Sequence, residues 1–356
     1  MTSWKFTTRA EDAWESMLAD CSRAERSIDI EQFVFQDDDI GKRFIKVLLQ
    51  KARAGLRVRL LLDAARSFPF SNSLRPAELK RAGAEIRFFN SINPWRVKYV
   101  KWWPFRDHRK LLVIDSTVGH TGGVGINARF QGWRDTNVRI EGPVVNEMAD
   151  AFKRMWESAA LHRFKRFARP MVDADGFQFM TNAPHVHQRF VYYALVNAIR
   201  KAKKTVYLTT PYFIPDLKFF RSIRRASGRG VDVRILLPNQ SDHPFIIDVA
   251  SSSYFSFAMK KGVRFFKYRD GIIHAKTAII DEAWSTVGSM NLDSQGLFWC
   301  YEGNIVSTNT EFARDLTQHF FVDLESSNEI QHDEWEKRSL GQKLLELSTW
   351  PIHKFL

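Results

Sequence analysis

The sequence predicts an α/β fold that consists of two similar α/β/α sandwich halves produced by an internal duplication. Residues 24–63 and 202–238 share one order of features: a β-rich run, a helical stretch and a Gly-apolar-x-Val-Arg segment leading into an aliphatic run. Each half also carries a His-x-Lys motif followed after four residues by Asp. Two such halves pack most simply about a pseudo-twofold axis, so we expect one active site at their interface. Two separate half-sites are the alternative, which we disfavour because one His cannot readily serve as both nucleophile and acid.

The first half, residues 1–165, is expected to alternate strands and helices. Apolar residues at turn spacing within 24–63 predict a helix between two strands. Segment 80–89 resembles a helix end with Gly at its C-cap, followed by a strand. The aliphatic run 111–115 is typical of a buried central strand. This alternation predicts a mostly parallel sheet with helices on its faces.

The second half, residues 166–356, repeats this order after a basic stretch that ends at Pro170. Segment 211–215, Pro-Tyr-Phe-Ile-Pro, is expected to be a rigid strand end whose aromatic rings could line a pocket. The tail, residues 335–356, has leucines at roughly helical spacing with basic residues between them. It could dock on a membrane or pack back on the second half, and packing is favoured.

Composition restricts the partners. The formal net charge of +13 predicts attraction to an anionic partner, namely nucleic acid, acidic lipid or a phosphorylated ligand. The two cysteines exclude a disulfide framework and a Cys-based zinc site. No window approaches the roughly 18 apolar residues of a membrane span, and the N-terminus has no apolar signal segment. We therefore expect any membrane association to be peripheral.

The paired motifs supply the groups that attack on a phosphodiester requires. A neutral imidazole can attack phosphorus while an imidazolium protonates the departing oxygen, and two ammonium groups can hold the non-bridging oxygens. These groups replace a metal ion, so we expect no metal and no other cofactor. The motif residues, taken together as the catalytic set, are His108, Lys110, Asp115, His274, Lys276 and Asp281.

Four acidic residues divide into two pairs with different expected roles. Asp115 and Asp281 end their aliphatic runs. Although both belong to the motif, the favoured interpretation is that each carboxylate bonds nearby backbone and fastens the junction between strand and loop. Asp135 and Glu302 follow His108 and His274 by 27 and 28 residues, at equivalent points of the repeat. We expect each of this second pair to orient the imidazole that precedes it.

Other polar residues near the motifs are candidates for binding phosphate oxygens. Ser289 and Asn291 follow the second motif, and Asn127 follows the first. His185 and His187 could form half of a metal site, but the lack of further ligands at zinc spacing favours a polar loop.

The first half carries an insertion between Phe89 and His108 that the second half lacks. Its mixture of aromatic and basic side chains suits a lipid headgroup boundary, and an ordinary loop that caps the core is an equal alternative. The residues concerned are Trp95, Arg96, Lys98, Tyr99, Lys101, Trp102, Trp103, Phe105 and Arg106.

The motifs resemble those of the phospholipase D superfamily, and within it the bacterial cardiolipin synthases of the short form without N-terminal membrane helices. The resemblance covers nearly the whole chain and includes WRDTNVRIEGP, TTPYFIPD, VDVRILLPNQSD and WSTVGSMNLDSQ. It implies a phosphohistidine formed without metal, with His108 as nucleophile and His274 as acid and base. One departure is Gly125, where the family usually has Asn. Either Asn127 reaches the phosphate instead, or the first half contributes one donor fewer.

This resemblance implies transfer of a phosphatidyl group to phosphatidylglycerol, giving cardiolipin, by a cytoplasmic protein held peripherally on the inner membrane. The expected partner is anionic phospholipid in a membrane surface, with phosphatidylglycerol as substrate. Hydrolysis of phospholipids is the close alternative. A nuclease or other phosphodiesterase of the same superfamily is less favoured, because the aromatic insertion has no obvious use there. A catalytically inactive binding module is disfavoured because binding requires no matched histidines.

Overall fold

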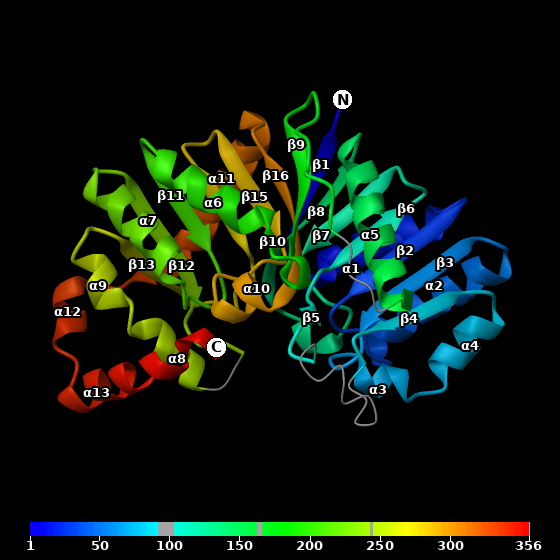
Figure 1. The fold of residues 1–356 in the computed structure, drawn as a ribbon, viewed down its shortest axis with the longest axis horizontal. Coiled ribbons are helices and arrows are strands. Elements are labelled where there is room, and N and C mark those ends of the chain that lie inside the picture. The colour runs from blue at the N-terminus through cyan, green and yellow to red at the C-terminus, as the bar shows by residue number, and fades with distance from the viewer. Residues whose placement is uncertain (92–102, 162–165, 243–244, 356) are drawn as a thin grey trace.

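The computed structural model describes residues 1–91, 103–161, 166–242 and 245–355. These residues form two mixed sheets with helices packed on both faces of each (Figure 1). The expected α/β fold with two similar halves is confirmed. The boundary expected between residues 165 and 166 stays a prediction, since 162–165 lie outside the described residues.

The sheet of the first half has seven strands in the order β1-β8-β7-β6-β2-β3-β4. Its strands are β1 (Ser3–Arg9), β2 (Ser27–Gln32), β3 (Arg57–Asp63), β4 (Glu85–Phe89), β6 (Leu111–Ile114), β7 (Val118–Gly122) and β8 (Arg134–Glu141). The helices are α1 (Ala10–Arg23), α2 (Asp39–Arg53), α3 (Phe68–Ser71), α4 (Arg75–Arg81) and α5 (Val144–Leu161).

The second sheet has ten strands, nine of them in the order β10-β9-β16-β15-β14-β11-β12-β13-β17. The tenth strand, β5 (Arg106–Asp107), comes from the first half and pairs with β16. The strands of this half are β9 (Phe177–Ala183), β10 (Gln188–Arg189), β11 (Thr205–Thr209), β12 (Asp232–Pro238), β13 (Arg264–Tyr268), β14 (Thr277–Ile280), β15 (Trp284–Gly288), β16 (Cys300–Ser307) and β17 (Ser327–Glu329). The helices are α6 (Phe190–Lys201), α7 (Leu217–Gly228), α8 (Phe245–Ser252), α9 (Phe255–Met259), α10 (Ser294–Phe298), α11 (Thr310–Glu325), α12 (His332–Glu336) and α13 (Leu340–Ser348).

The duplication is visible in the strand order, because β8-β7-β6-β2-β3-β4 repeats as β16-β15-β14-β11-β12-β13. In each half three adjacent strands are parallel, and the strands that follow the motif pair antiparallel. The short strand β5 is also parallel to its neighbour β16. The expectation of a mostly parallel sheet is therefore wrong. Only short turns separate β6 from β7 and β14 from β15, and parallel pairing needs a long crossover.

The equivalent helices α2 and α7 begin and end in the same way. Asp38 and Asp216 cap their N-termini, each accepting hydrogen bonds from backbone N–H groups of the first turn. Gly55 and Gly230 follow their C-termini with φ of +87° and +89°, a conformation that favours glycine. The Gly of the repeated Gly-apolar-x-Val-Arg segment thus reverses the chain from helix to strand in both halves.

The two halves share a buried core. One apolar cluster combines α5 and strands of the first sheet with Phe177, Phe179 and Ile305 of the second. Side chains from β9 and β16 therefore pack with those of α5, and Figure 1 shows these strands beside β1 and β8 at the centre of the molecule. This contact brings the start of β8 and the start of β16 to the same place.

The tail packs on the second half, as favoured from the sequence. The Trp335 ring lies 5.3 Å from that of Phe255, and the His353 imidazole bonds to the Tyr254 hydroxyl at 2.9 Å. The leucines of α13 nevertheless stay exposed. Among the described helices, none combines the length and the hydropathy that a membrane span would require.

Candidate active site

Each His-x-Lys segment is held by the opposite half. The segment before His108 forms β5, which pairs with β16, and the His108 N–H donates to the Tyr301 carbonyl at 3.0 Å. Reciprocally, the His274 N–H donates to the carbonyl of Arg134, the first residue of β8, at 2.7 Å. The halves therefore exchange their motif segments across the interface.

This exchange determines which carboxylate meets which imidazole. Nδ1 of His108 lies 2.9 Å from Oε1 of Glu302, and Nδ1 of His274 lies 2.8 Å from Oδ2 of Asp135. The expectation that each carboxylate orients the histidine of its own half is wrong. Glu302 lies on β16 and Asp135 on β8, the strands to which the opposite motif segments are bonded.

The two lysines lie against the backbone of their motifs. Nζ of Lys110 donates to the His108 carbonyl at 2.8 Å, and Nζ of Lys276 lies 2.8 Å from Nε2 of His274. Burial disfavours the ammonium form and lowers the pKa of Lys110 to about 8 and that of Lys276 to about 7. Both cations are therefore sensitive to pH near neutrality.

Burial also disfavours protonation of both imidazoles. It lowers the pKa of His274 to about 4 and that of His108 well below its ordinary value. Lys110 and Lys276 lower the pKa of His108 further, whereas for His274 Lys276 lowers it and Asp135 raises it. In the ligand-free protein both rings are therefore neutral at neutral pH. The negative charge of a phosphodiester bound between the rings would oppose the effect of burial and raise the pKa of each imidazole.

Both histidines line one cavity of about 420 Å³ between the halves. Its walls differ in charge, because the first half contributes cations and the second half contributes carboxylates. The charged lining residues besides the motifs are Arg66, Arg106 and Arg129 from the first half, and Asp242, Asp293 and Glu302 from the second. Arg129 and Asp242 form an ion pair of 3.1 Å across the cavity. Tyr212 of the expected rigid segment also lines it.

The candidate phosphate-binding residues occupy different positions. Asn291 and Asn127 line the cavity, and Oδ1 of Asn291 is buried without a partner among the described residues. The Ser289 hydroxyl instead donates to Oε2 of Glu302 and accepts from the Gly303 N–H at 3.0 Å. In the ligand-free protein this hydroxyl supports the carboxylate that orients His108, and binding of phosphate by Ser289 stays a prediction.

The first half has no counterpart of this serine. The equivalent residue is Gly123, where an added Cβ would lie 2.4 Å from the Asp135 carboxylate oxygens. Oδ1 of Asp135 is buried without a hydrogen-bond partner among the described residues. The two imidazole–carboxylate pairs thus occupy equivalent positions, but only the carboxylate of Glu302 receives a hydrogen bond from a serine hydroxyl.

Gly125 is equivalent to Asn291, since the matching bridges Phe35–Ile126 and Phe213–Leu292 follow them. A Cβ at Gly125 would lie 2.5 Å from Cγ1 of Val34. The asparagine expected there by family pattern has no room in this conformation. Asn127 lines the cavity but uses Oδ1 to accept from the Arg129 N–H at 2.8 Å.

The motif aspartates lie away from the cavity. Asp115 accepts hydrogen bonds from the N–H groups of residues 25, 26 and 27, and Asp281 from those of 203, 204 and 205, at 2.7 to 2.9 Å. These bonds lower the pKa of both carboxyls. The interpretation favoured from the sequence is confirmed, because each carboxylate fastens the start of one central strand to the end of its neighbour. A catalytic role for either aspartate stays an untested prediction.

The end of the first-half insertion reaches the site. Arg106 lines the cavity and pairs with Asp63 at 3.3 Å, while the Phe105 ring lies 4.2 Å from that of His185. Residues 92–102 of the insertion, which include Trp95, Arg96, Lys98, Tyr99, Lys101 and Trp102, lie outside the described residues. Arg66 also lines the cavity and belongs to no motif in the sequence. Asp242 lines it too, as the last residue of the segment VDVRILLPNQSD, to which no site role was assigned from the sequence.

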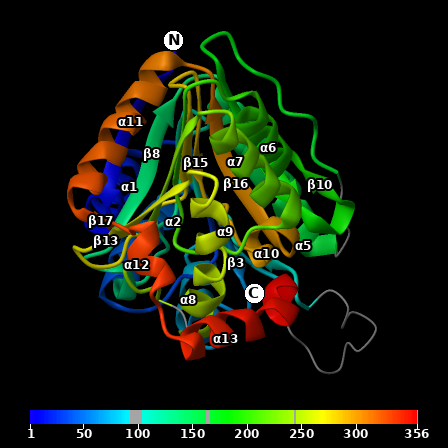
Figure 2. The same ribbon diagram turned by 90° about the vertical axis from the view of Figure 1, so that its left-hand side faces the viewer.

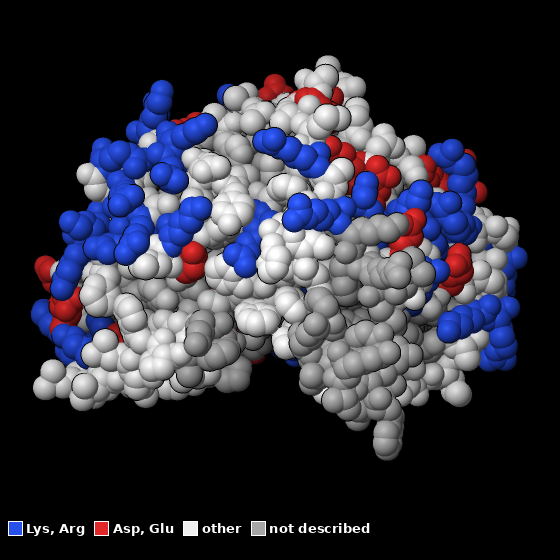
Figure 3. All heavy atoms as spheres, viewed as in Figure 1, with Lys and Arg blue, Asp and Glu red and all other residues white. Residues whose placement is uncertain are grey.

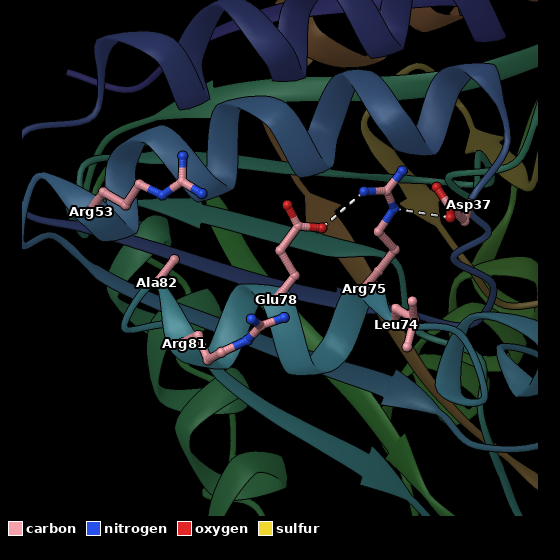
Figure 4. A pocket seen from close by; sticks show the side chains of 7 residues that line it. All are labelled: Asp37, Arg53, Leu74, Arg75, Glu78, Arg81 and Ala82. Atoms are coloured by element: carbon pink, nitrogen blue, oxygen red, sulfur yellow. Dashed lines mark hydrogen bonds and ion pairs between the residues drawn. The ribbon is translucent and has the colours of Figure 1, made fainter.

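A larger hollow of about 910 Å³ lies between α2 and α4, away from the histidines. Figure 4 shows its Arg75 paired with Asp37 and Glu78. It contains no histidine, serine or cysteine, so the candidate chemistry belongs to the smaller cavity. Within the described part of the chain, no three His, Cys, Asp or Glu side chains gather in a way that could hold a metal ion.

Comparison with known proteins agrees with this geometry. The chain is 32% identical to a cardiolipin synthase of Clostridium perfringens strain 13, over 96% of this chain and 74% of that protein. It is 31% identical to cardiolipin synthase 1 of Bacillus cereus, over 97% of this chain and 71% of that protein. The fold is similar to a crystal structure of phosphatidylserine synthase from Haemophilus influenzae, with a TM-score of 0.74 and 13% identity over 99% of this chain and 93% of that chain.

The family model described as cardiolipin synthase, phospholipase D-like domain, matches residues 17–156 and 195–324. The two matched segments coincide with the two structural repeats, and each contains one of the paired histidines. The chain therefore belongs to the cardiolipin synthase family of phospholipase D-like phosphatidyltransferases.

Proposed function

We propose that the protein makes cardiolipin by transferring a phosphatidyl group from one phosphatidylglycerol to another through a phosphohistidine. The observation that carries this proposal is the pair of crossed imidazole–carboxylate contacts in one cavity. Nδ1 of each ring faces a carboxylate, so Nε2 is the ring nitrogen that would meet the substrate. In the ligand-free protein Nε2 of His274 lies 2.8 Å from Nζ of Lys276, and protonation of the ring would replace this contact. The cardiolipin synthases to which the chain is similar support the choice of substrate.

In the first step Nε2 of His108 attacks phosphorus of the donor lipid, and the bond from phosphorus to the glycerol headgroup oxygen breaks. Protonated His274 gives its Nε2 proton to that oxygen, so glycerol leaves and phosphatidyl-His108 remains. The negative phosphodiester supplies the field that raises the pKa of His274 from its value in the empty site.

In the second step neutral His274 removes the proton from a headgroup hydroxyl of a second phosphatidylglycerol. The hydroxyl oxygen bonds to phosphorus, the phosphorus–nitrogen bond breaks, and cardiolipin leaves with His108 neutral again. Water in place of the lipid hydroxyl would give phosphatidic acid. The order of roles, with His108 as nucleophile, follows the family resemblance.

The cations hold the charge of the phosphoryl group in both steps. Lys110 and Arg106 line the cavity and can donate to non-bridging oxygens. Asn291 can add an amide donor from the second half. We place this reaction at the cytoplasmic face of the cell membrane, where the anionic donor and acceptor lie in one leaflet.

The test is incubation with phosphatidylglycerol vesicles, with products measured by mass spectrometry. Equal amounts of cardiolipin and glycerol are the expected result, and excess chelator should leave the rate unchanged. His108→Ala and His274→Ala should each abolish turnover, while His332→Ala, on the exposed side of α12, should not. Phosphatidic acid as the main product would replace transfer with hydrolysis. Cleavage of DNA with no lipid turnover, or strong inhibition by chelator, would contradict the proposal.

A further inference from the structure

We propose that the mouth of the cavity docks on the bilayer through an apolar rim, a role that rests on the proposed function and extends it. The apolar rim consists of Phe68, Phe245, Leu340, Leu344, Leu347 and Trp350. These side chains are 46% to 79% exposed, and they come from α3 of the first half and from α8, α13 and the tail of the second. The occupant is a phospholipid surface.

Helix α13 is firmly attached to the protein, although its leucines face solvent. Arg338 pairs with Glu346 at 2.9 Å, and Ser339 and Gln342 form a capping box at its N-terminus. Helix α13 packs against α8, and after the helix Nδ1 of His353 lies 2.9 Å from the hydroxyl of the buried Tyr254, which lies between α8 and α9. Exposure of the leucines is therefore a property of a fixed helix and not of a frayed end.

The exposed leucines form one stripe. Leu340, Leu344 and Leu347 are spaced i, i+4 and i+7, which places them on one face of the helix. They are 79%, 66% and 55% exposed, and no residue of α13 is buried. A contiguous apolar surface of this kind marks an interaction site, whereas isolated exposed leucines do not.

In both halves, residues of the apolar rim lie close in the chain to residues of the cavity wall. Helix α8 has Ile247 in the cavity wall and Phe245, two residues earlier, 71% exposed. In the first half, Arg66 lines the cavity and Phe68, two residues later, is 63% exposed. Figure 1 shows α3, α8 and α13 along the same lower edge, and the turned view of Figure 2 keeps α8 and α13 together there.

The tail connects α13 to the cavity wall. Helix α13 packs against α8, and the 3-10 helix Trp350–Phe355 packs against α10, whose Gly296 lines the cavity. In Figure 3 the lower edge below α8 is largely free of charged side chains, which gather higher on the same half. The apolar surface thus lies below the basic surface of the same half, and the packing of α13 on α8 and of the tail on α10 places it beside the cavity wall.

A bilayer explains this arrangement because the substrate carries acyl chains. Moving each methylene of a chain from lipid into water costs about 0.8 kcal/mol, so the chains must stay in lipid while the headgroup enters the cavity. The mouth can admit the headgroup only if it lies at the membrane surface. Arg129, 53% exposed at the cavity, supplies positive charge where anionic headgroups would enter.

The test compares two double variants that each add two negative charges to exposed apolar positions. The rim variant is Leu340→Glu with Leu344→Glu, and the control is Met171→Glu with Val172→Glu. Met171 and Val172 are 76% and 52% exposed and precede Phe177, which pairs with Ser307 at the end of β16 opposite Glu302. The control therefore changes surface charge far from the entrance.

Three measurements are made on the full chain: sedimentation with phosphatidylglycerol vesicles, turnover on those vesicles, and turnover on a short-chain phosphatidylglycerol dissolved as monomers. We expect the rim variant to lose at least about tenfold in vesicle binding and vesicle turnover while keeping turnover on the dissolved lipid. The control should match the unchanged protein in all three.

Unchanged vesicle binding by the rim variant would overturn the proposal, as would an equal loss on dissolved and vesicle lipid. A protein that is dimeric in solution, with the rim variant monomeric and vesicle binding unchanged, would assign the surface to a second copy of the chain. Sedimentation needs no turnover, so it tests the rim even if the unchanged protein turns over neither lipid. Absence of turnover of both lipids by the unchanged protein would contradict the proposed function and leave the docking proposal to the sedimentation result.

Discussion

At the scale of single residues, the two imidazole–carboxylate pairs differ in one hydroxyl group. Ser289 donates to Glu302, whereas Gly123 lies against Asp135 and leaves no space for a side chain. The serine hydrogen bond lowers the pKa of Glu302, which burial raises well above its ordinary value. The carboxylate of the pair that contains His108 therefore has an additional donor that favours its ionised form, and an ionised partner stabilises a nucleophile that must become a cation.

We predict that Ser289→Ala lowers kcat by roughly tenfold to a hundredfold, because a hydrogen bond to a charged group is worth about 1.5–3 kcal/mol. Loss of the donor raises the pKa of Glu302, so the acid limb of the pH profile should move to higher pH. Ser285→Ala is the matched control, since this buried serine lies on β15, which ends just before Ser289, and its hydroxyl has no partner among the described residues. An unshifted acid limb in Ser289→Ala would contradict the assigned role.

The lysines give a second prediction at this scale. Their pKa values of about 7 and about 8 mean that Lys276 and then Lys110 lose their charge as pH rises. Affinity for an anion should therefore be highest below about pH 7 and fall by roughly tenfold or more by about pH 9. The ligand is glycerophosphoglycerol, a diester whose single charge does not change over this range, bound to the His108→Ala variant in a calorimeter. Lys276→Met should flatten the fall near pH 7 and keep the later one, and a flat profile in the parent would refute the prediction.

At the scale of elements, exchange of the motif segments decides how the site is built. Strand β5 crosses to β16, and the segment before His274 crosses to β8. The carboxylates then lie beside the crossing segments, because Glu302 and Asp135 are near the starts of β16 and β8. Each half-site is consequently assembled from both halves, and neither half contains a complete imidazole–carboxylate pair.

The crossed pairing predicts which step each carboxylate variant slows. The substrate is a phosphatidyl ester of nitrophenol, whose leaving group needs no protonation, so His274 is required only for the second step. Asp135→Asn should keep a burst of nitrophenol and slow the steady state, because it disturbs His274. Glu302→Gln should lose the burst, because it disturbs His108. The reverse pattern would indicate that the histidine roles are exchanged, and a burst in neither would contradict a covalent intermediate.

The elements also show what the sequence could predict. The sequence alone could predict the repeat, the paired motifs and the glycines that end the helices, because each depends on local spacing. The identity of Asp135 and Glu302 was readable from their equivalent positions, but their partners were not. Spacings of 27 and 28 residues fit a contact within one half as well as one between halves. Arg66 lay outside every motif, and Asp242 ended the segment VDVRILLPNQSD without an assigned role. Only the packing of the halves brings both side chains to the cavity.

At the scale of the whole molecule, the halves are joined through buried contacts as well as through the site. Arg134, at the start of β8, forms two hydrogen bonds of 2.6 and 2.7 Å with Asp323 of α11. Both side chains are largely buried, with 10% and 6% exposed. Arg134 also precedes Asp135 and accepts the backbone bond from His274, so this ion pair anchors the strand on which the second pair depends.

We therefore predict that Arg134→Met lowers the free energy of unfolding by about 3–5 kcal/mol, because it leaves the Asp323 carboxylate buried without its partner. Asp323→Leu should do the same, and the double variant should recover most of the loss, since two apolar side chains can replace a buried pair. Glu329→Gln is the control: the Glu329 and Arg264 side chains of its ion pair are 27% and 41% exposed, so the loss should stay below about 1 kcal/mol.

Urea unfolding followed by tryptophan fluorescence and circular dichroism measures all four variants. If the halves form one cooperative unit through this contact, the transitions by fluorescence and by circular dichroism should coincide in every variant and shift to the same urea concentration. Separate transitions for the two probes, or additive losses in the double variant, would show that the ion pair does not join the halves.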